Sequence, residues 1–322
     1  MEDYLLSKVK FFNNCTSIKQ ELSGHSSALR YICELDNNKY FVKIYSENNL
    51  EQIKKIDLIY KKLNVPTSSI VEAKYLNDLK KTLVIYEYIE GKEIYDLTKE
   101  LNIEEIEKIG FKVGKNLAKF KRIKCNKQKL INLYDKEFNK LADNIYIIKE
   151  FYENSENKKL YSIDLDKLYN IFLDYKKYVY NSEPSFIHGD INLHNVIVKN
   201  KKTYFIDTSN GKNGFRVLDF RGNCWFGWDG DNKFNEQAMF RGIYKGLFNG
   251  KIPDEFHKEL AFTIIYEFLL KINEGYEKND MGKIEYNFYK FGKMFDKTNY
   301  FENYEFEWFE WGGVWWNYIF WK

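Results

Sequence analysis

The stretch His188-Gly189-Asp190-Ile191-Asn192-Leu193-His194-Asn195, followed twelve residues later by Asp207, carries the strongest structural signal in this sequence. Short apolar segments surround it, at residues 186–187, 196–198 and 203–206. Their alternation and β-branched residues predict a strand, a tight loop, a second strand, a turn and a third strand. We therefore expect a hairpin that brings Asp190, Asn195 and Asp207 to one rim.

These residue types suit the chemistry of phosphoryl transfer. Mg²⁺ prefers oxygen ligands, which the Asn195 carbonyl and the Asp207 carboxylate would supply. An aspartate that binds no metal, here Asp190, can orient a substrate hydroxyl and accept its proton. An aspartate-rich turn with no catalytic role is the alternative, and the strands on both sides of the motif disfavour it.

The spacing Asp190-x4-Asn195 with a later Asp207 resembles the catalytic loop and metal-binding aspartate of protein kinases. His-Gly-Asp replaces His-Arg-Asp, and Ile206-Asp207-Thr208 replaces Asp-Phe-Gly. This variant resembles the aminoglycoside phosphotransferase and choline kinase superfamily, whose members phosphorylate small molecules on a kinase-like fold. The resemblance implies that Asp190 is the catalytic base, that Asn195 and Asp207 bind the metal, and that the cofactors are ATP (or GTP) and Mg²⁺.

The same resemblance implies an α+β, two-lobed, protein-kinase-like fold. Residues 1–90 would form an antiparallel β N-lobe, with a nucleotide-binding sheet, one helix and a hinge. Residues 91–322 would form a mainly helical C-lobe with the catalytic hairpin and a helical substrate-binding region.

Nucleotide-binding parts of such a site occur in the expected order. Residues 40–45 predict a strand that contains Lys43, which the resemblance implies as a ligand of the nucleotide phosphates. A turn-rich segment before it contains Gly24, Ser26 and Ser27 and resembles the nucleotide-binding turn of the family, in which Ser26 and Ser27 would donate hydrogen bonds to phosphate oxygens. Considered alone, a serine-glycine turn and a lysine on a strand are also compatible with an ordinary solvated hairpin.

The helix predicted over residues 49–63 should provide an acidic partner for Lys43. Asp57 and Glu51 are both candidates, and the sequence leaves the choice open. The apolar strand at residues 82–89, which meets a turn at Gly91, resembles the hinge of the family. Adenine would then bind to backbone groups in that hinge, at Glu87, Tyr88 and Ile89.

Helices are predicted through most of the second lobe. Asn102 and Glu105 form the pattern of a helix N-terminus with a capping box. Helical periodicity continues at residues 136–149, 165–180 and 252–272.

The acceptor site has the weakest sequence signal. Asp219 is similar to a later aspartate that ties down the loop in the family, although the usual Gly-Asp-Pro turn is missing. Carboxylates among aromatic residues near the C-terminus would suit a cationic amino sugar or amino alcohol. Those candidates also fit a tail that packs on the core or on a second subunit; they are Asp229, Asp231, Glu305 and Glu307.

Composition predicts a cytoplasmic catalytic chain, monomeric or homodimeric, that acts on a small molecule. The 322 residues have a formal net charge of +3 and no dense basic block, which argues against nucleic-acid binding. No signal peptide or bilayer-spanning segment is evident, so no membrane partner is expected. The widely spaced cysteines form no Cys-x-x-Cys pair and argue against a zinc site or disulfide scaffold; they are Cys15, Cys33, Cys125 and Cys224.

Other functions fit the same motif. A choline-like metabolite kinase and a spore-coat-type relative are alternatives among enzymes, and a catalytically silent kinase-fold binding protein is the alternative outside them. A protein kinase fits poorly, because no Ala-Pro-Glu segment follows Asp207. The acceptor and the choice between ATP and GTP stay open.

Overall fold

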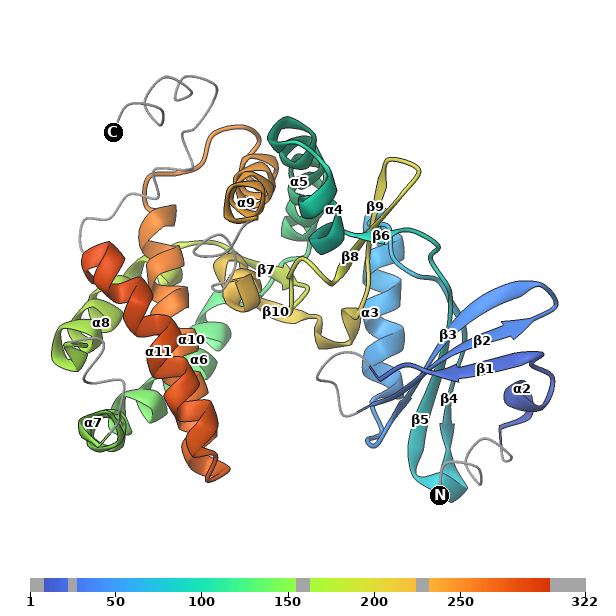
Figure 1. The fold of residues 1–322 in the computed structure, drawn as a ribbon, viewed down its shortest axis with the longest axis horizontal. Coiled ribbons are helices and arrows are strands. Elements are labelled where there is room, and N and C mark those ends of the chain that lie inside the picture. Colours follow the sequence, from blue (N-terminus) through green and yellow to red (C-terminus); the bar gives the residue numbers. More distant parts are fainter. Residues whose placement is uncertain (1–8, 23–27, 155–162, 224–231, 302–322) are drawn as a thin grey trace. The chain divides into compact units, whose positions relative to one another are not determined.

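The computed structural model describes residues 9–22, 28–154, 163–223 and 232–301, and Figure 1 shows their elements. The chain forms two compact units. The first unit contains Met1–Ile94 and His194–Asn210, and the second contains Tyr95–Leu193 and Gly211–Lys322. Residues 194–210 therefore belong to the first unit, although they follow the second unit's first segment in the chain.

A five-stranded antiparallel sheet forms the centre of the first unit, in the order β1-β2-β3-β5-β4. Lys43 lies in β3, opposite Val84 of β5. The expected strand at residues 40–45 is thus confirmed. The strands are β1 (Ser17–Gln20), β2 (Leu29–Leu35), β3 (Asn38–Tyr45), β4 (Ile70–Leu76) and β5 (Lys81–Glu87).

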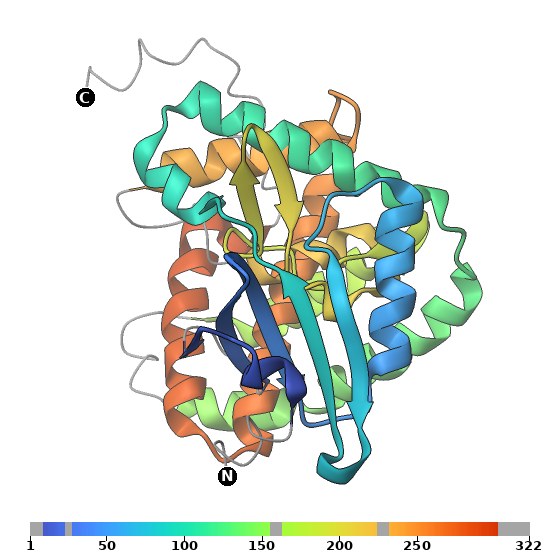
Figure 2. The ribbon, with the colours of Figure 1, turned by 90° about the vertical axis from the view of Figure 1, so that its right-hand side faces the viewer.

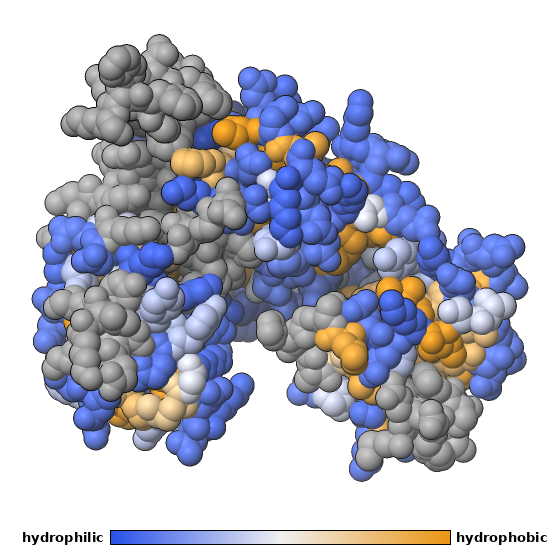
Figure 3. Space-filling model, in the orientation of Figure 1, coloured by the Kyte–Doolittle hydropathy of each residue, from blue (hydrophilic) through white to orange (hydrophobic). Residues whose placement is uncertain are grey.

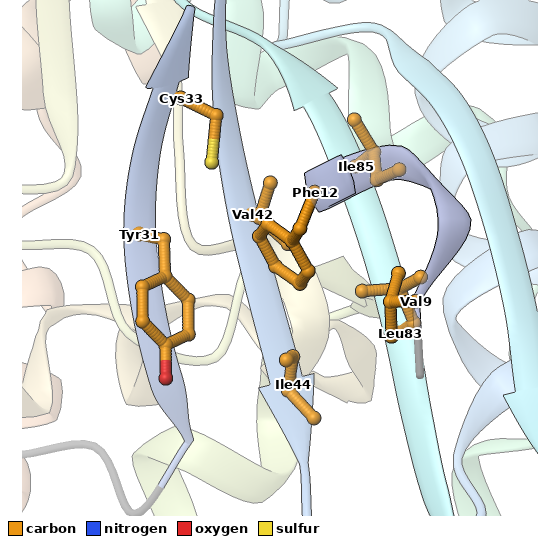
Figure 4. Packing of buried hydrophobic residues seen from close by; sticks show 8 residues of the cluster. All are labelled: Val9, Phe12, Tyr31, Cys33, Val42, Ile44, Leu83 and Ile85. Atoms are coloured by element: carbon orange, nitrogen blue, oxygen red, sulfur yellow. The ribbon is translucent and has the colours of Figure 1, made fainter. Parts of the chain in front are cut away.

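Helices cover both faces of this sheet (Figures 1 and 2). On one face, Ile53 of α3 (Leu50–Leu63) packs against Val84 and Tyr86. On the other face, Phe12 of the short helix α2 (Lys10–Asn13) joins a cluster of buried side chains. Figure 4 shows that cluster, which contains Val9, Phe12, Tyr31, Cys33, Val42, Ile44, Leu83 and Ile85. Alternate residues of each strand thus fill two separate cores.

A second, three-stranded sheet completes the first unit. It consists of β6 (Lys92–Glu93), β8 (Val196–Lys199) and β9 (Lys202–Phe205), in the order β6-β8-β9. Phe205 donates its N–H to the carbonyl of Pro66 and accepts a hydrogen bond from the Thr67 hydroxyl at 2.8 Å. Gly91 is required beside this sheet, because a Cβ there would lie 2.5 Å from the Val198 carbonyl oxygen. These contacts attach the motif hairpin to the first unit.

The second unit is mainly helical. Its core includes stacked rings, with the centroids of Phe172 and Phe262 4.7 Å apart. Asn102 and Glu105 form the predicted capping box at the start of α5. The helices are α4 (Ile94–Glu100), α5 (Ile103–Leu117), α6 (Lys127–Asp143), α7 (Ile145–Glu153), α8 (Leu165–Asn181), α9 (Lys233–Leu247), α10 (Phe256–Glu277) and α11 (Met281–Thr298).

Short 3₁₀ helices connect several of these elements. In the first unit they are η1 (Asn77–Leu79) and η4 (Thr208–Asn210). In the second unit they are η2 (Ala118–Arg122), η5 (Arg216–Asn223) and η6 (Asn299–Phe301).

Two local expectations need correction. The strand before the motif, β7 (Pro184–Ile187), does not pair with β8; it pairs with β10 (Lys212–Phe215) in a separate two-stranded sheet. The helix expected over residues 136–149 is two helices, α6 and α7, that meet at Asn144. The hydrophobic periodicity of the sequence continues across Asn144, so it did not indicate that one helix ends and another begins there.

Helices α5 and α9 pack through pairs of glycines. A Cβ at Gly110 or Gly114 would collide with backbone carbonyls of α9, and one at Gly242 or Gly246 would collide with carbonyls of α5. Beside this contact, Glu107 of α5 pairs with both Arg241 and Lys245 of α9; the Glu107–Lys245 distance is 2.9 Å. The small residues therefore set the separation of the two helices.

The surface drawn in Figure 3 is mostly hydrophilic in the described part of each unit. Within the described ranges, every helix is too short or too polar to cross a lipid bilayer.

Candidate active site

Lys43 is a buried cation in the first unit. Only 5% of the residue is exposed, although a lysine inside a sheet normally reaches water. Its ammonium lies 2.8 Å from a carboxylate oxygen of Asp207, 164 residues later in the chain. The Phe41 ring also lies beneath it, with the centroid 5.8 Å from Nζ. A buried ammonium that faces a carboxylate and a ring is held in one position.

Asp207 is placed at the end of the β8–β9 hairpin with an unusual backbone. Its φ is +54°, in the left-handed region that non-glycine residues seldom adopt and that is common at functional sites. The Ser209 hydroxyl donates to its Oδ1 at 3.3 Å. The side chain is 29% exposed, so the carboxylate reaches both Lys43 and solvent.

Asn195 lies beside Asp207 because the β8–β9 ladder extends one residue beyond its strands. The N–H of Ile206 donates to the Asn195 carbonyl at 3.0 Å, next to the paired residues Val196 and Phe205. The hairpin thus brings the backbones of Asn195 and Asp207 together. An amide oxygen and a carboxylate form a donor set that fits Mg²⁺. Among the described residues, no group of three or more His, Cys, Asp or Glu side chains forms a metal site that uses protein ligands alone.

The two candidate partners of Lys43 differ in their surroundings. Glu51 is 89% exposed and lies 3.8 Å from Lys54. Asp57 is only 13% exposed; its Oδ2 lies 2.7 Å from Lys61, and its Oδ1 is buried without a hydrogen bond in the described part of the chain. Burial raises the pKa of Tyr86 most, Tyr45 raises it further, and the carboxylates of Asp207 and Asp57 add smaller effects in the same direction. Asp57 is therefore the acid of α3 that faces the Lys43–Asp207 region.

In the segment predicted to be the hinge, some backbone groups already form hydrogen bonds within the protein. The N–H of Glu87 donates to the Ser69 carbonyl at 2.9 Å, and that of Tyr88 donates to the Lys39 carbonyl at 3.1 Å. The Ser68 hydroxyl donates to the Glu87 carbonyl. Among the described residues, no hydrogen bond involves the backbone of Ile89. The N–H groups of Glu87 and Tyr88 are therefore not available to bind a base. Ile89 is the next residue along the chain, and its backbone is available.

The loop that contains Asp190, in the second unit, is anchored by Asp219. Its two carboxylate oxygens accept the N–H groups of His188 at 3.0 Å and Gly189 at 2.7 Å. Its carbonyl accepts the N–H of Ile191 at 3.3 Å. Gly189 has φ +87°, which a residue with a Cβ rarely adopts. These bonds surround Asp190 and confirm that Asp219 ties down the loop.

Asn192 positions Asp190 directly. Its side-chain amide donates to Oδ1 of Asp190 at 3.2 Å, and Asp190 is half-buried. This role of Asn192 is not among the predictions from the sequence. The signal was present, since an asparagine two residues after an aspartate can reach back to that side chain within one tight turn.

Charged side chains lie around the anchored loop in the second unit. The Tyr266 hydroxyl donates to Glu137, and Arg221 lies 3.1 Å from Glu267. The pKa of Lys212 is lowered, first because protein atoms displace water around the ammonium and second because Arg221 is near; Glu137 and Asp219 act in the opposite direction. Both positive and negative groups therefore lie near Asp219.

Several expected site residues lie outside the described residues. For the phosphate turn these are Gly24, Ser26 and Ser27. For the acceptor site these are Asp229, Asp231, Glu305 and Glu307. Their roles stay predictions.

Comparisons with known proteins identify a family and a fold. A model of the phosphotransferase enzyme family matches residues 19–247. A search of curated protein sequences found no match. An apo structure of a thermostable mutant of aminoglycoside phosphotransferase APH(4)-Ia is similar, with 12% identity and a TM-score of 0.60 over 93% of this chain and 99% of that one.

Two further solved structures show the same fold. A complex of gentamicin with APH(2")-IIa is 16% identical, with a TM-score of 0.61 over 91% of this chain and 97% of that one. Ethanolamine kinase of Plasmodium vivax is 16% identical, with a TM-score of 0.56 over 92% of this chain and 88% of that one. The expected fold is confirmed: an antiparallel β unit and a mainly helical unit, as in small-molecule kinases.

Proposed function

Because the chain belongs to the phosphotransferase enzyme family, we propose that it transfers the γ-phosphate of a nucleotide, with Mg²⁺, to a hydroxyl of a small molecule. The observation that carries this proposal is the 2.8 Å pair of Lys43 and Asp207. A phosphate-binding cation and a metal-binding carboxylate must lie together for phosphoryl transfer, and residues 164 positions apart do so here. The buried position of Lys43 also argues against a solvated surface lysine.

Each residue of the site has one proposed task. Asn195 and Asp207 hold Mg²⁺, which neutralises charge on the transferred phosphoryl group when it is bound. Lys43 binds nucleotide phosphates. When Asp207 ligates the metal, the Asp57 carboxylate partly neutralises the charge of the Lys43 ammonium. Ile89 receives the base at the hinge, through its backbone.

On the acceptor side, Asp190 orients the hydroxyl and accepts its proton. Asn192 fixes the Asp190 carboxylate through the 3.2 Å hydrogen bond, and Asp219 fixes the backbone around it. General base catalysis of this kind contributes about 10²–10⁴-fold to a rate. The loop is therefore built for positioning, which is the larger part of phosphoryl-transfer catalysis.

The acceptor we propose is an aminoglycoside or a similar cationic amino sugar or amino alcohol. Support comes from the ligands named for similar structures, which are gentamicin and, by its activity, ethanolamine. Among the charged groups near the loop, the Glu137 carboxylate would attract a cationic acceptor. A choline-like metabolite kinase belongs to the same chemical class and is tested by the same experiment.

The test is an acceptor screen with Mg-ATP and Mg-GTP. Aminoglycosides, ethanolamine, choline, other amino alcohols and neutral sugars would be incubated with the protein, and phosphorylated products would be identified by mass. For an acceptor so identified, Asp190→Asn should lower kcat by about 10²–10⁴-fold. Asp254→Asn, at an exposed aspartate, is the matched control and should leave kcat unchanged.

Two outcomes contradict the proposal. Turnover by Asp190→Asn at the wild-type rate would remove the role of Asp190. Nucleotide-dependent stabilisation without any phosphorylated product would instead favour a silent kinase-fold binding protein.

A further inference from the structure

Two charged side chains near the anchored loop form no ion pair in the described part of the chain. The Lys212 ammonium also forms no hydrogen bond there, and the residue is exposed. Glu137 of α6 is partly exposed, and the hydrogen bond to its carboxylate comes from the neutral hydroxyl of Tyr266. The neighbouring Arg221, in contrast, pairs with Glu267 at 3.1 Å. Lys212 and Glu137 therefore carry charges that a ligand can use.

The two side chains come from elements that meet on one face of β10. Gly214, two residues after Lys212 in this strand, faces α6, because a Cβ there would lie 2.9 Å from the Tyr134 hydroxyl oxygen. Alternate residues of a strand share a face, so Lys212 extends from that same face. Glu137 follows Tyr134 by one helical turn in α6 and is held by Tyr266 of α10. Lys212 and Glu137 thus belong to the same side of the strand.

The strand pairing places Lys212 beside the start of the loop that contains Asp190. β7 and β10 are antiparallel neighbours (Figure 1), and Lys212 lies opposite Ile187, the last residue of β7. Asp190 follows Ile187 by three residues, which span at most about 11 Å. Asp219 fixes the backbone between them through the N–H groups of His188 and Gly189. A small acceptor whose hydroxyl lies at Asp190 therefore has its other end in the neighbourhood of Lys212.

The surroundings of the Lys212 ammonium favour an anionic ligand. Protein atoms displace water around it and Arg221 lies near, and both lower its pKa; Glu137 and Asp219 act in the opposite direction. The influence of Glu137 agrees with its place on the same face of β10. An ammonium that has lost water is stabilised by a carboxylate in hydrogen-bond contact. The Glu137 carboxylate in turn has lone pairs beyond the bond from Tyr266, and a ligand ammonium can donate to them.

We propose that Lys212 and Glu137 form a head-group site for the acceptor, in which Lys212 binds a carboxylate and Glu137 binds an ammonium. The acceptor is then a hydroxyl-bearing zwitterion, such as an amino acid with a hydroxyl in its side chain. A purely cationic acceptor would be attracted by Glu137 and repelled by Lys212, whereas a ligand with both charges satisfies both residues. This inference rests on the proposed function and narrows its amino alcohols to those that also carry a carboxylate.

Matched acceptors test which charges the ligand needs. L-homoserine carries a hydroxyl, an ammonium and a carboxylate; 3-amino-1-propanol lacks the carboxylate, and 4-hydroxybutyrate lacks the ammonium. L-serine, ethanolamine and 3-hydroxypropionate form a second, shorter series. In a series that is phosphorylated with Mg-ATP, we expect kcat/KM for the zwitterion to exceed that for each relative about tenfold or more, which is the effect of one hydrogen bond to a charged group. An equal or higher kcat/KM for the amino alcohol would overturn the proposal.

Substitutions test the two residues through ratios of kcat/KM, because a variant that merely folds poorly lowers both members of a ratio alike. Lys212→Ala should lower the ratio of homoserine to 3-amino-1-propanol about tenfold or more, and Lys212→Arg should retain it. Glu137→Gln should lower the ratio of homoserine to 4-hydroxybutyrate in the same way. Lys251→Ala, at an exposed lysine of the same unit, is the matched control and should change neither ratio. A wild-type ratio in Lys212→Ala would remove the role of Lys212.

Binding without turnover separates this inference from the proposed function. The Kd of L-homoserine and of L-serine would be measured by calorimetry for the wild type and for Lys212→Ala, without nucleotide. We expect the Kd to rise about tenfold or more in the variant. If a zwitterion binds in this way and no acceptor is phosphorylated, the proposed function fails while the head-group site stands. If no zwitterion binds or reacts, the head-group site is overturned, whatever other acceptor the protein phosphorylates.

Discussion

At the scale of single residues, one ammonium and two carboxylates determine the charge of the proposed nucleotide site. Lys43 pairs with Asp207 in this structure, and Asp57 contributes a buried oxygen without a hydrogen-bond partner among the described residues. A metal bound to Asp207 would compete for that carboxylate. A second acid is then needed to keep Lys43 in place, and Asp57 has the required burial whereas Glu51 is in solvent.

We predict that Asp57→Asn raises the KM for Mg-ATP about tenfold or more, because a hydrogen bond to a charged group is worth roughly 1.5–3 kcal/mol. Glu51→Gln is the matched control on the same helix and should change the KM little. Steady-state kinetics with a saturating acceptor would measure both. The assignment fails if Glu51→Gln has the larger effect.

Asp219 gives a prediction for the dependence of stability on pH. Burial raises its pKa from 3.8 to about 7, although the N–H groups of His188 and Gly189 act against the rise. A raised carboxyl pKa means that the folded state holds the proton more tightly than the unfolded state does. The stabilisation is therefore complete below about pH 4 and is lost as the pH rises through about 7.

We expect the free energy of unfolding of the wild type to fall between pH 5 and pH 7 more steeply than that of Asp219→Asn. One proton limits the difference in slope to about 1.4 kcal/mol per pH unit. Asparagine accepts only one of the two N–H groups, so this variant should also be less stable at every pH. Urea titrations across this pH range would measure both effects, and equal slopes would show that Asp219 is ionised in the folded protein.

At the scale of elements, the contact between α5 and α9 depends on glycine. A Cβ at Gly114 would collide with the Ile243 backbone, which cannot move aside as a flexible side chain would. We predict that Gly114→Ala lowers the free energy of unfolding by about 1–3 kcal/mol through overpacking.

Gly282 is the matched control for that prediction. It is also helical, and a Cβ there would meet nothing closer than 3.6 Å. Gly282→Ala should leave stability unchanged or raise it by up to about 1 kcal/mol, because alanine favours a helix. Chemical denaturation of both variants would compare them, and similar losses would mean that close packing of α5 and α9 is not the cause.

At the scale of the whole molecule, the proposed tasks divide between the two units. Lys43, Asn195 and Asp207 belong to the first unit, and Asp190 belongs to the second. The chain passes between the units at residues 94–95, 193–194 and 210–211. The motif of residues 188–195 therefore contributes to both units, and nucleotide binding should be separable from chemistry by mutation.

We predict that Lys43→Ala loses most of the thermal stabilisation by Mg-ATP, while Asp190→Asn keeps it. A ligand at about 100 times its Kd stabilises a protein by about 2.7 kcal/mol, so the difference is measurable. Chelation of the metal with EDTA should reduce the stabilisation in the wild type and in Asp190→Asn alike. Loss of ATP binding in Asp190→Asn would mean that the two tasks are not divided in this way.

The sequence by itself determined those features that depend on residues close together in the chain. The helix at residues 49–63, the capping box of Asn102 and Glu105, and the two strands before Asp207 follow from periodicity and local hydrogen bonding, and the structure confirms them. The catalytic motif also identified the family, because its spacing is local.

Only the tertiary structure decided which distant segments meet. It pairs Lys43 with Asp207, joins β7 to β10, and anchors the loop at residues 188–191 on Asp219. No short window of sequence contains both members of these pairs. Their contact depends on which apolar faces are buried against one another and on the path of the chain between them, and these are properties of the folded molecule as a whole.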